Sequence, residues 1–442
     1  MEEQALVDSL WECTGPDAAP PVAWSAVGRP GGLASAYPVG ELAVACQVNA
    51  LRAASRWWSA GGAAPAVSLD RGHASAAFRL EAHIAPRGWT LPPAWDPVAG
   101  DYRCADGWLR LHTNYPWHRA AAVAVLRCDE TREAFAEAVA RWPGEALEEA
   151  VIARGGCAAQ LRSPEAWAQH PAGRAVAGQP LVGFAGRREP RAPRGGSAPL
   201  EGVRVVDLTR VIAGPVCTRF LASMGAEVTR VDPPGFEEVA ALLPETTRGK
   251  RRVALDLRSG AGREAMRRLL GEADVLVHGL RPGALEALGL GRGALDAIRP
   301  GLLDASICAY GSTGPWSMRR GFDSLVQMSS GIAWVPGDEK PRPLPAQALD
   351  HGAGYLLAAA VCRALDRPVA SIRVSLARVA VELEARRGTG DPAMPPLGPE
   401  QAAETGFTDE VETGWGPARM LRPVGRVGDF EARLDLAPGP LG

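Results

Sequence analysis

The central part of the chain alternates short apolar runs with stretches of helical periodicity. Residues 203–206 form an apolar run typical of a buried strand, and a turn at 213–215 leads into an apolar-faced helix. A second apolar run over 226–231 ends at an acidic residue, Asp232. Strand, turn, helix and strand in this order predict a βαβ unit with a right-handed crossover.

The same alternation continues as far as residue 308. The pattern predicts further elements at 252–257 (strand), 260–271 (helix), 274–278 (strand), 283–298 (helix) and 302–308 (strand). Such alternation is typical of a mainly parallel sheet with helices on both faces, which binds ligands at the carboxyl ends of its strands. We therefore predict an α/β fold with a doubly wound, Rossmann-like sheet over residues 200–385.

Two stretches of biased composition divide the chain. Residues 186–199 are basic and rich in Pro and Gly, and residues 386–404 contain several Gly and Pro residues with little apolar periodicity. Both are typical of linkers. We expect an N-terminal part before 186–199, and a second linker with a C-terminal tail over 386–442.

The N-terminal part contains a weak copy of a segment of the α/β domain. Glu41 begins an Ala-rich helical pattern that is followed by Val67-Ser68-Leu69, and Asp350 begins another that is followed by Val374-Ser375-Leu376. The carboxylate precedes the Val-Ser-Leu strand by 26 residues in the first copy and by 24 in the second. Either the chain carries parts of two related units, or Ala-rich helices look alike in a biased composition.

Composition excludes several classes of function. A net charge of −2 gives no broad attraction to nucleic acid or to an anionic membrane. The 442 residues are 46% hydrophobic and 22% charged, which is ordinary for a soluble protein of two or three domains. Eight scattered cysteines, an acidic N-terminus and the lack of a long apolar run predict a cytoplasmic protein with reduced thiols, no metal site and no membrane span.

Motifs between residues 199 and 376 resemble, in order, those of the family III CoA-transferases, the CaiB/BaiF family, which also includes α-methylacyl-CoA racemases. They are the opening βαβ unit at 200–235, Arg248-Gly249-Lys250-Arg251, Arg281-Pro282-Gly283, Gly311-Ser312-Thr313-Gly314-Pro315 and Gly321-Phe322-Asp323. The resemblance implies a CoA-transferase fold and activity for this part of the chain.

The resemblance extends to the N-terminal half. Residues 101–109 and 162–167 resemble the small domain of the family, so we expect a smaller α+β domain over 76–185. Residues 1–75 resemble the helix and strand that follow the catalytic aspartate in the family. The two domains would then occur in reversed order along the chain. Family members are interlocked homodimers, which implies a homodimer here.

Asp350 is the candidate catalytic residue. It stands at or near the start of a helix, where the dipole favours an ionised carboxylate, and such a carboxylate is a usable nucleophile. The residues alone favour a helix-capping aspartate, and the family resemblance described above reverses that preference. The resemblance implies that Asp350 attacks an acyl-CoA to give an anhydride, then an aspartyl-CoA thioester, from which an acceptor carboxylate takes the CoA.

Coenzyme A is therefore expected as a substrate, with no permanently bound cofactor. Its phosphates require cations, and its pantetheine arm requires backbone contacts. The candidate CoA-binding residues are Arg210, Val211, Ala213, Arg248, Lys250, Arg251 and Arg281. A solvated basic turn explains each of the cations at 248–251 equally well. A dinucleotide site is disfavoured, because the first turn lacks the G-x-G-x-x-G pattern.

Two other functions stay open. Racemases of the family carry a histidine where this chain has Phe322, and phenylalanine cannot transfer a proton. His351 cannot easily replace it, since adjacent helical residues point about 100° apart. The third possibility is a non-catalytic CoA-binding protein. Glu41 corresponds to Asp350 in the repeat, where a solvated helix-start glutamate is a simpler explanation than a second nucleophile.

Overall fold

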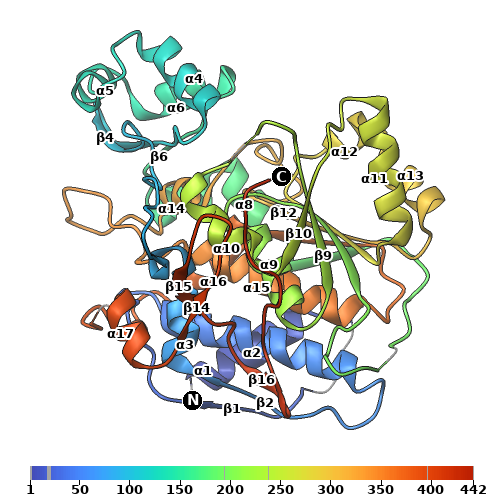
Figure 1. Ribbon diagram of the computed structural model, residues 1–442. Helices are drawn as coiled ribbons and strands as arrows, with labels where there is room; N and C mark the ends of the chain where they lie inside the picture. The colour runs from blue at the N-terminus through green and yellow to red at the C-terminus, as the bar shows by residue number, and fades with distance from the viewer. Residues whose placement is uncertain (1, 17–20, 194, 237, 396, 442) are drawn as a thin grey trace.

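The computed structural model describes residues 2–16, 21–193, 195–236, 238–395 and 397–441. Its centre is a seven-stranded sheet, and the predicted mixed α/β architecture with a mainly parallel sheet is confirmed (Figure 1). All neighbours in this sheet are parallel except the last pair. In spatial order the strands are β10 (Lys250–Ala254), β9 (Glu227–Asp232), β8 (Arg204–Leu208), β11 (Val275–His278), β12 (Leu303–Cys308), β13 (Ser371–Ser375) and β7 (Val182–Ala185).

Helices cover both faces of this sheet, because side chains of successive strand residues point to opposite sides. Val206 packs in a cluster with residues of α11 (Gly260–Glu272), α12 (Ala284–Ala287) and α13 (Arg292–Ile298). Val205 packs on the other side, in the main core of the protein. That side is covered by α9 (Ala213–Ser223) and α15 (Ala348–Ala364).

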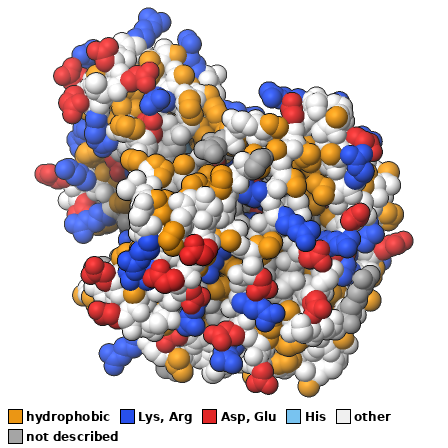
Figure 2. All heavy atoms as spheres, viewed as in Figure 1, with side chains coloured by type: hydrophobic (Ala, Val, Ile, Leu, Met, Phe, Trp, Pro, Cys, Tyr) orange, Lys and Arg blue, Asp and Glu red, His pale blue; other side chains and the backbone are white. Residues whose placement is uncertain are grey.

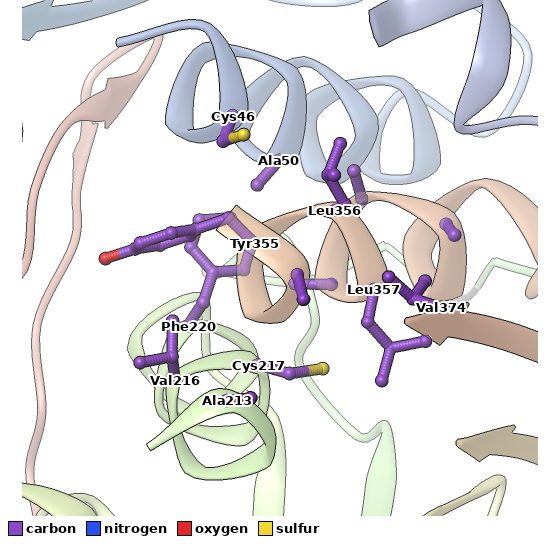
Figure 3. Packing of buried hydrophobic residues seen from close by; sticks show 14 of the residues in the cluster. Cys46, Ala50, Ala213, Val216, Cys217, Phe220, Tyr355, Leu356, Leu357 and Val374 are labelled. Carbon is purple, nitrogen blue, oxygen red and sulfur yellow. The ribbon is translucent and has the colours of Figure 1, made fainter. Parts of the chain in front are cut away.

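Helix α15 lies at the centre of the main core. All 17 of its residues are buried, because α9 covers one side and α2 (Val39–Trp58) covers another. Figure 3 shows Ala50 of α2 close to Leu356, and Phe220 of α9 beneath the ring of Tyr355. The N-terminal part of the chain is thus packed directly on the α/β domain, with which it shares one hydrophobic core.

Strands from both ends of the chain pair with each other. A four-stranded sheet contains β1 (Trp24–Val27), β2 (Val67–Asp70), β16 (Arg426–Val427) and β17 (Phe430–Glu431). A second sheet joins β3 (Ala85–Pro86) to β14 (Thr408–Val411) and β15 (Ala418–Leu421). The remaining helices of these regions are α1 (Glu2–Cys13), α3 (Arg71–Ala77), α16 (Leu376–Glu384) and α17 (Pro399–Glu404). The C-terminal tail therefore completes sheets that begin in the N-terminal part.

Residues 98–160 form a small lobe with its own core around Leu109, Phe135 and Leu147. It stands off the main body at the upper left of Figure 1. Its elements are β4 (Gly100–Cys104), β5 (Gly107–Leu111), α4 (Pro116–Leu126), α5 (Arg132–Val139), α6 (Gly144–Ala153) and β6 (Ala158–Gln160). The expected range 76–185 is wider than this lobe. Helices α7 (Pro164–Gln169) and α8 (Pro171–Ala177) return the chain to the main body, where β7 becomes the edge strand of the large sheet.

Two predicted elements have different bounds in the structure. The helix expected over 283–298 is two short helices, because Gly289 has a φ of 71° and the chain turns there. The strand expected over 252–257 already begins at Lys250, whose side chain is buried against β8. Within the described ranges, no helix has the length and apolar character needed to cross a membrane.

Candidate active site

A cavity of about 530 Å³ opens at the carboxyl ends of β8, β11 and β12. These strands flank the point where the spatial order of the sheet reverses, which is where open α/β sheets bind ligands. The small lobe supplies the opposite wall through Tyr115, Trp117 and His118. In Figure 2 a notch in the outline separates this lobe from the rest of the upper surface. The cavity therefore lies between two parts of one chain.

Asp350 lies in the wall of this cavity, as the third residue of α15. It is not the cap of the helix, because Gln347 occupies that position. The side chain is only 6% exposed, and its carboxylate has no hydrogen-bond partner among the described residues. Asp350 also lines a smaller cavity of about 100 Å³, on the other side of Val211 and Phe322. Its carboxylate thus stands at the boundary between two hollows.

A second carboxylate fixes the start of α15. Asp323, the first residue of α14 (Asp323–Ser330), accepts a hydrogen bond of 2.9 Å from the backbone N–H of Asp350. Its other oxygen accepts one from Gln327, whose own side-chain oxygen accepts from the N–H of Leu344. This network positions the backbone of Asp350. Asp323 therefore holds the start of α15 in place.

Burial and neighbouring charges raise the pKa of Asp350, and burial raises that of Asp323. Burial raises the pKa of Asp350, and the charges of Asp323 and Glu81 raise it further. Burial likewise raises the pKa of Asp323, although its hydrogen bonds oppose the shift. A carboxylate that is desolvated and close to other acids is a stronger nucleophile than one in water.

His351 points away from Asp350, as expected for adjacent residues of a helix. Its Nε2 lies 3.4 Å from an oxygen of Glu81, and its ring stacks on Phe78 with the centroids 5.4 Å apart. Burial alone would raise the pKa of Glu81, but the hydrogen bond and charge of His351 bring it below its usual value. His351 is thus engaged with Glu81 and does not face Asp350.

Four of the seven candidate CoA-binding residues line the large cavity with Asp350. They are Arg210, Val211, Ala213 and Arg281. Arg210 is held in place by an ion pair of 3.2 Å with Asp232 and a hydrogen bond to the carbonyl of Val231. Arg281 is exposed and has no partner among the described residues. It is therefore available to an anion.

The other three candidates, Arg248, Lys250 and Arg251, do not line the cavity. The side chain of Lys250 is fully buried and forms an ion pair of 3.0 Å with Asp207. Arg248 is also buried and donates to the carbonyl of Leu421 in the C-terminal tail. Arg251 is exposed on β10, at the far edge of the sheet. The basic turn is therefore structural at two positions and remote from the cavity at the third.

Val211 has an unusual backbone conformation at the boundary between the two cavities. Its φ of 67° lies in the left-handed region, which a β-branched residue rarely adopts. The conformation is held by its own N–H, which donates a hydrogen bond of 2.8 Å to Glu238. Glu238 is fixed in turn by an ion pair of 2.7 Å with the buried Arg230.

Sequence reasoning missed several residues of the large cavity. Arg319 and Arg320 line it and directly precede the Gly321-Phe322-Asp323 motif, so the doubled arginine was the available signal. Tyr115 and Trp117 stack with their ring centroids 4.8 Å apart. Trp-rich segments alone predict packing, and only the fold brings these rings to the cavity.

Phe322 stands where the resemblance places the histidine of racemases. Its ring stacks almost parallel on that of His112 in the small lobe, with the centroids 3.7 Å apart. His112 also lines the smaller cavity. Glu41, the counterpart of Asp350, is half-buried at the start of α2 and lines neither cavity. Over the described ranges, no group of three or more metal-binding side chains comes together.

Part of this chain is similar in sequence to known proteins. Residues 200–396 match CoA-transferase family III. The probable fatty acyl-CoA transferase Rv3272 of Mycobacterium tuberculosis is 37% identical over 209 residues, which cover 43% of this chain and 53% of that relative. Human succinyl-CoA:glutarate CoA-transferase is 34% identical over 167 residues, or 35% of this chain and 38% of that relative.

A crystal structure of Rv3272 aligns with 56% of this chain and 97% of that one, at 26% identity and a TM-score of 0.48. In sequence, this chain spans about half or less of the length of the curated relatives that it matches.

Proposed function

We propose that this chain, whose residues 200–396 belong to CoA-transferase family III, moves coenzyme A between an acyl-CoA and a carboxylic acid. One observation carries the proposal: a buried carboxylate without a hydrogen-bond partner, Asp350, shares a cavity with four arginines. The names of the relatives, which include succinyl-CoA:glutarate and formyl-CoA:oxalate CoA-transferases, support the same chemistry.

The reaction begins at the Asp350 carboxylate. A carboxylate oxygen attacks the thioester carbonyl of the acyl-CoA, the carbon–sulfur bond breaks, and CoA leaves as a thiolate. The product is a mixed anhydride between the acyl group and Asp350. The thiolate then attacks the aspartyl carbonyl and expels the donor acid, which leaves Asp350 as a CoA thioester. An acceptor carboxylate reverses both steps and departs as the new acyl-CoA.

Each step forms an oxyanion that needs hydrogen-bond donors. The first turn of α9 lines the cavity at Ala213 and Gly214, and N–H groups at a helix start have no partner within the helix. We assign the oxyanion to these amides, since the helix dipole also favours negative charge there. A side chain at Gly214 would lie 2.2 Å from Cβ of Thr209, so only glycine allows this turn to approach the strand end.

The arginines suit the phosphates of CoA. Arg281 is exposed and unpaired over the described part of the chain, and Arg320 lies at the same cavity with one nitrogen bonded to the carbonyl of Gly155. We assign phosphate contacts to these two residues. Arg210, Val211 and Ala213 are assigned to the pantetheine arm, because they line the same cavity as Arg281, Arg320 and Asp350.

The strand order supports this placement. Numbered from β8 along the chain, the first six strands stand in the spatial order 3-2-1-4-5-6, which is that of the doubly wound Rossmann fold. The antiparallel β7 extends the sheet beyond them. We propose that the fold is Rossmann-like, with CoA bound at the reversal point next to β8.

One chain supplies both walls of the cavity, so we propose that each chain carries a complete site. The homodimer and the cytoplasmic location that we expect from the sequence remain predictions. Light scattering at different protein concentrations would show whether the chain changes between monomer and dimer. If each chain carries a complete site, the specific activity should stay constant across that change.

Racemisation and CoA binding without catalysis would each require a different set of residues at the site. Racemisation requires a base that removes the α-proton, and Phe322 cannot provide one. A protein that only binds CoA has no need of a buried nucleophile with a raised pKa. Transfer is the function that the geometry supports best.

The test uses the full chain, an acyl-CoA and hydroxylamine. Attack by hydroxylamine on the anhydride or on the thioester converts the Asp350 side chain to a hydroxamate, which peptide mass spectrometry detects. We expect the modification at Asp350 and exchange of labelled free CoA into acyl-CoA. Lack of both results would overturn the proposal. Exchange of the α-proton without transfer would favour the isomerase.

A further inference from the structure

The smaller cavity beside Asp350 has a composition that limits what it can hold. Three carboxyl groups line it, from Glu81, Asp323 and Asp350, and the described lining residues include neither lysine nor arginine. The guanidinium of Arg110 stacks over Trp95, which lines this cavity, but it is paired with Asp101 at 2.7 Å. A second carboxylate on a ligand would meet like charges here and no counter-ion.

The position of Asp350 connects this cavity to the reaction. The thioester carbonyl must lie against the Asp350 carboxylate, and the CoA portion extends into the large cavity with its arginines. The acyl chain continues from the other side of the same carbonyl carbon. The smaller cavity, which shares Val211 and Phe322 with the large one, is the other hollow that Asp350 lines.

Two residues that line this cavity each carry a buried polar atom without a partner among the described residues. The Ser324 hydroxyl and the Nδ1 atom of His112 have no hydrogen-bond partner among the described residues, although these residues are only 5% and 4% exposed. Leaving such groups unpaired in a buried place is unfavourable. The ring of His112 is fixed by its stack on Phe322. A ligand with a hydroxyl or carbonyl oxygen at this place would satisfy one or both groups.

The volume sets the length of the acyl chain. The cavity measures about 100 Å³, whereas a cavity of about 150 Å³ accommodates benzene. About four non-hydrogen atoms beyond the carbonyl carbon therefore fit.

We infer that the acyl group of the substrate is short and uncharged and carries a hydrogen-bonding oxygen, and that it is bound in the cavity lined by Ser324 and His112. The inference rests on the proposed CoA transfer at Asp350 and specifies its substrate class. Short hydroxyacyl-CoA or oxoacyl-CoA thioesters have this chemistry.

The experiment compares four thioesters as CoA donors: 3-hydroxybutyryl-CoA, butyryl-CoA, succinyl-CoA and octanoyl-CoA. We expect kcat/KM for 3-hydroxybutyryl-CoA to exceed that for butyryl-CoA by about ten-fold or more, because the latter leaves the polar groups unpaired. The kcat/KM for succinyl-CoA should be lower than that for butyryl-CoA, and E81Q should reduce the difference between these two donors. Octanoyl-CoA should be the poorest.

A matched pair of variants measures the contribution of the Ser324 hydroxyl to the substrate preference. Ser324 and Ser330 lie on the same helix, and both hydroxyls are buried without a partner in the described part of the chain, but only Ser324 lines the cavity. S324A should abolish most of the preference for 3-hydroxybutyryl-CoA over butyryl-CoA, and S330A should leave it unchanged. W95A should improve octanoyl-CoA, whereas W89A, a half-buried tryptophan outside the cavity, should not.

The outcomes separate the two proposals. Equal rates with 3-hydroxybutyryl-CoA and butyryl-CoA, or a preference for succinyl-CoA or octanoyl-CoA, would overturn the inference while Asp350 is still modified. If none of the four thioesters modifies Asp350 in the hydroxylamine test, the proposed function fails, and the inference fails with it.

Discussion

Two segments of the chain, α2–β2–α3 and α15–β13–α16, have the same local structure. Helix α2 starts at Pro38 with φ −77° and ψ 61°, and α15 starts at Gln347 with φ −76° and ψ 62°. Neither cap makes a side-chain hydrogen bond, and a carboxylate follows three residues later in both, as Glu41 and Asp350. Each helix leads to a strand that ends at the cap of another helix. The weak sequence repeat is therefore a repeat of structure.

The surroundings of the two carboxylates differ. The start of α15 is held by Asp323 and lines two cavities. The start of α2 lies among other acids. Burial raises the pKa of Glu41, and the charges of Glu3, Glu2 and Asp391 raise it further. Strand β13 lies in the large sheet, and β2 lies in a small sheet with β1 and β16. A carboxylate at a helix start acquires chemistry only where the tertiary structure gives it a ligand cavity.

The strongest test of this contrast replaces each carboxylate by its amide. D350N removes the nucleophile and should lower kcat for CoA transfer by about 10³-fold or more. E41Q should leave kcat within about two-fold of the wild-type value, because Glu41 lines neither cavity. Steady-state rates with the best donor, together with circular dichroism to verify folding, give the answer. A comparable loss in both variants would remove the functional distinction between the two segments.

A second test concerns how closely α15 approaches α9. A Cβ atom at Gly354 would lie 2.5 Å from the carbonyl of Ala213 and 2.8 Å from Val216, whereas one at Gly352 would meet Val379 at 3.2 Å. G354A should destabilise the protein by about 1–3 kcal/mol and slow transfer, because Ala213 must move. G352A should change stability by less than about 1 kcal/mol, since its helix propensity improves.

The corresponding residues of α2 are Ala43 and Ala45, so the second helix tolerates alanine at both positions. Urea unfolding of the two variants is the measurement. Equal stability of G354A and G352A would show that α9 does not require the glycine.

A third test uses stability as a function of pH. The folded-state pKa of Asp350 is raised by burial, Asp323 and Glu81, so its ionisation in the folded protein costs stability. Below a pH of about 4, the ordinary range for aspartate, the group is protonated in both states and the cost is absent. As pH rises through the raised pKa, the cost appears in full. D350N should therefore gain stability over the wild type as pH rises above about 4, and the gain should level off above the raised pKa.

The advantage of D350N should disappear near pH 4 in urea titrations across the acidic range. E41Q should show a change of the same sign but smaller, because Glu41 is half-buried. An advantage that does not depend on pH would point to packing instead of charge.

The sequence predicted most strands and helices of the large sheet because they are apolar or amphipathic runs, but it did not predict the edge strand β7. Of the eight site residues that it predicted, five share a cavity, namely Asp350, Arg210, Val211, Ala213 and Arg281. It could not predict that Lys250 is buried, since its partner Asp207 lies 43 residues earlier on another strand. The pairing depends on how β8, β9 and β10 pack, and a basic turn looks the same with or without it.

The residues that the small lobe contributes to the site could not be predicted from the sequence for a similar reason. Tyr115 and Trp117 are far from Asp350 along the chain, and no local pattern distinguishes an aromatic pair at a cavity from one in a core. Their contribution follows from the return of the chain through α7 and α8 to β7, which brings the lobe over the sheet.

The smallest effect is expected at the caps where each repeat ends. The Asp70 carboxylate accepts from the N–H of His73 at 3.1 Å, and the Ser375 hydroxyl accepts from the N–H of Arg378 at 3.3 Å. D70A and S375A should each lower the free energy of unfolding by about 1 kcal/mol, with the larger loss at Asp70, because its charge also interacts with the helix dipole. D70S and S375D should restore most of the stability. Neither cap lines the cavities at Asp350, so kcat should stay unchanged in all four variants. A fall of kcat in S375A alone would mean that α16 positions its first residue, Leu376, in the cavity wall, and the two repeats would then differ in function at both ends.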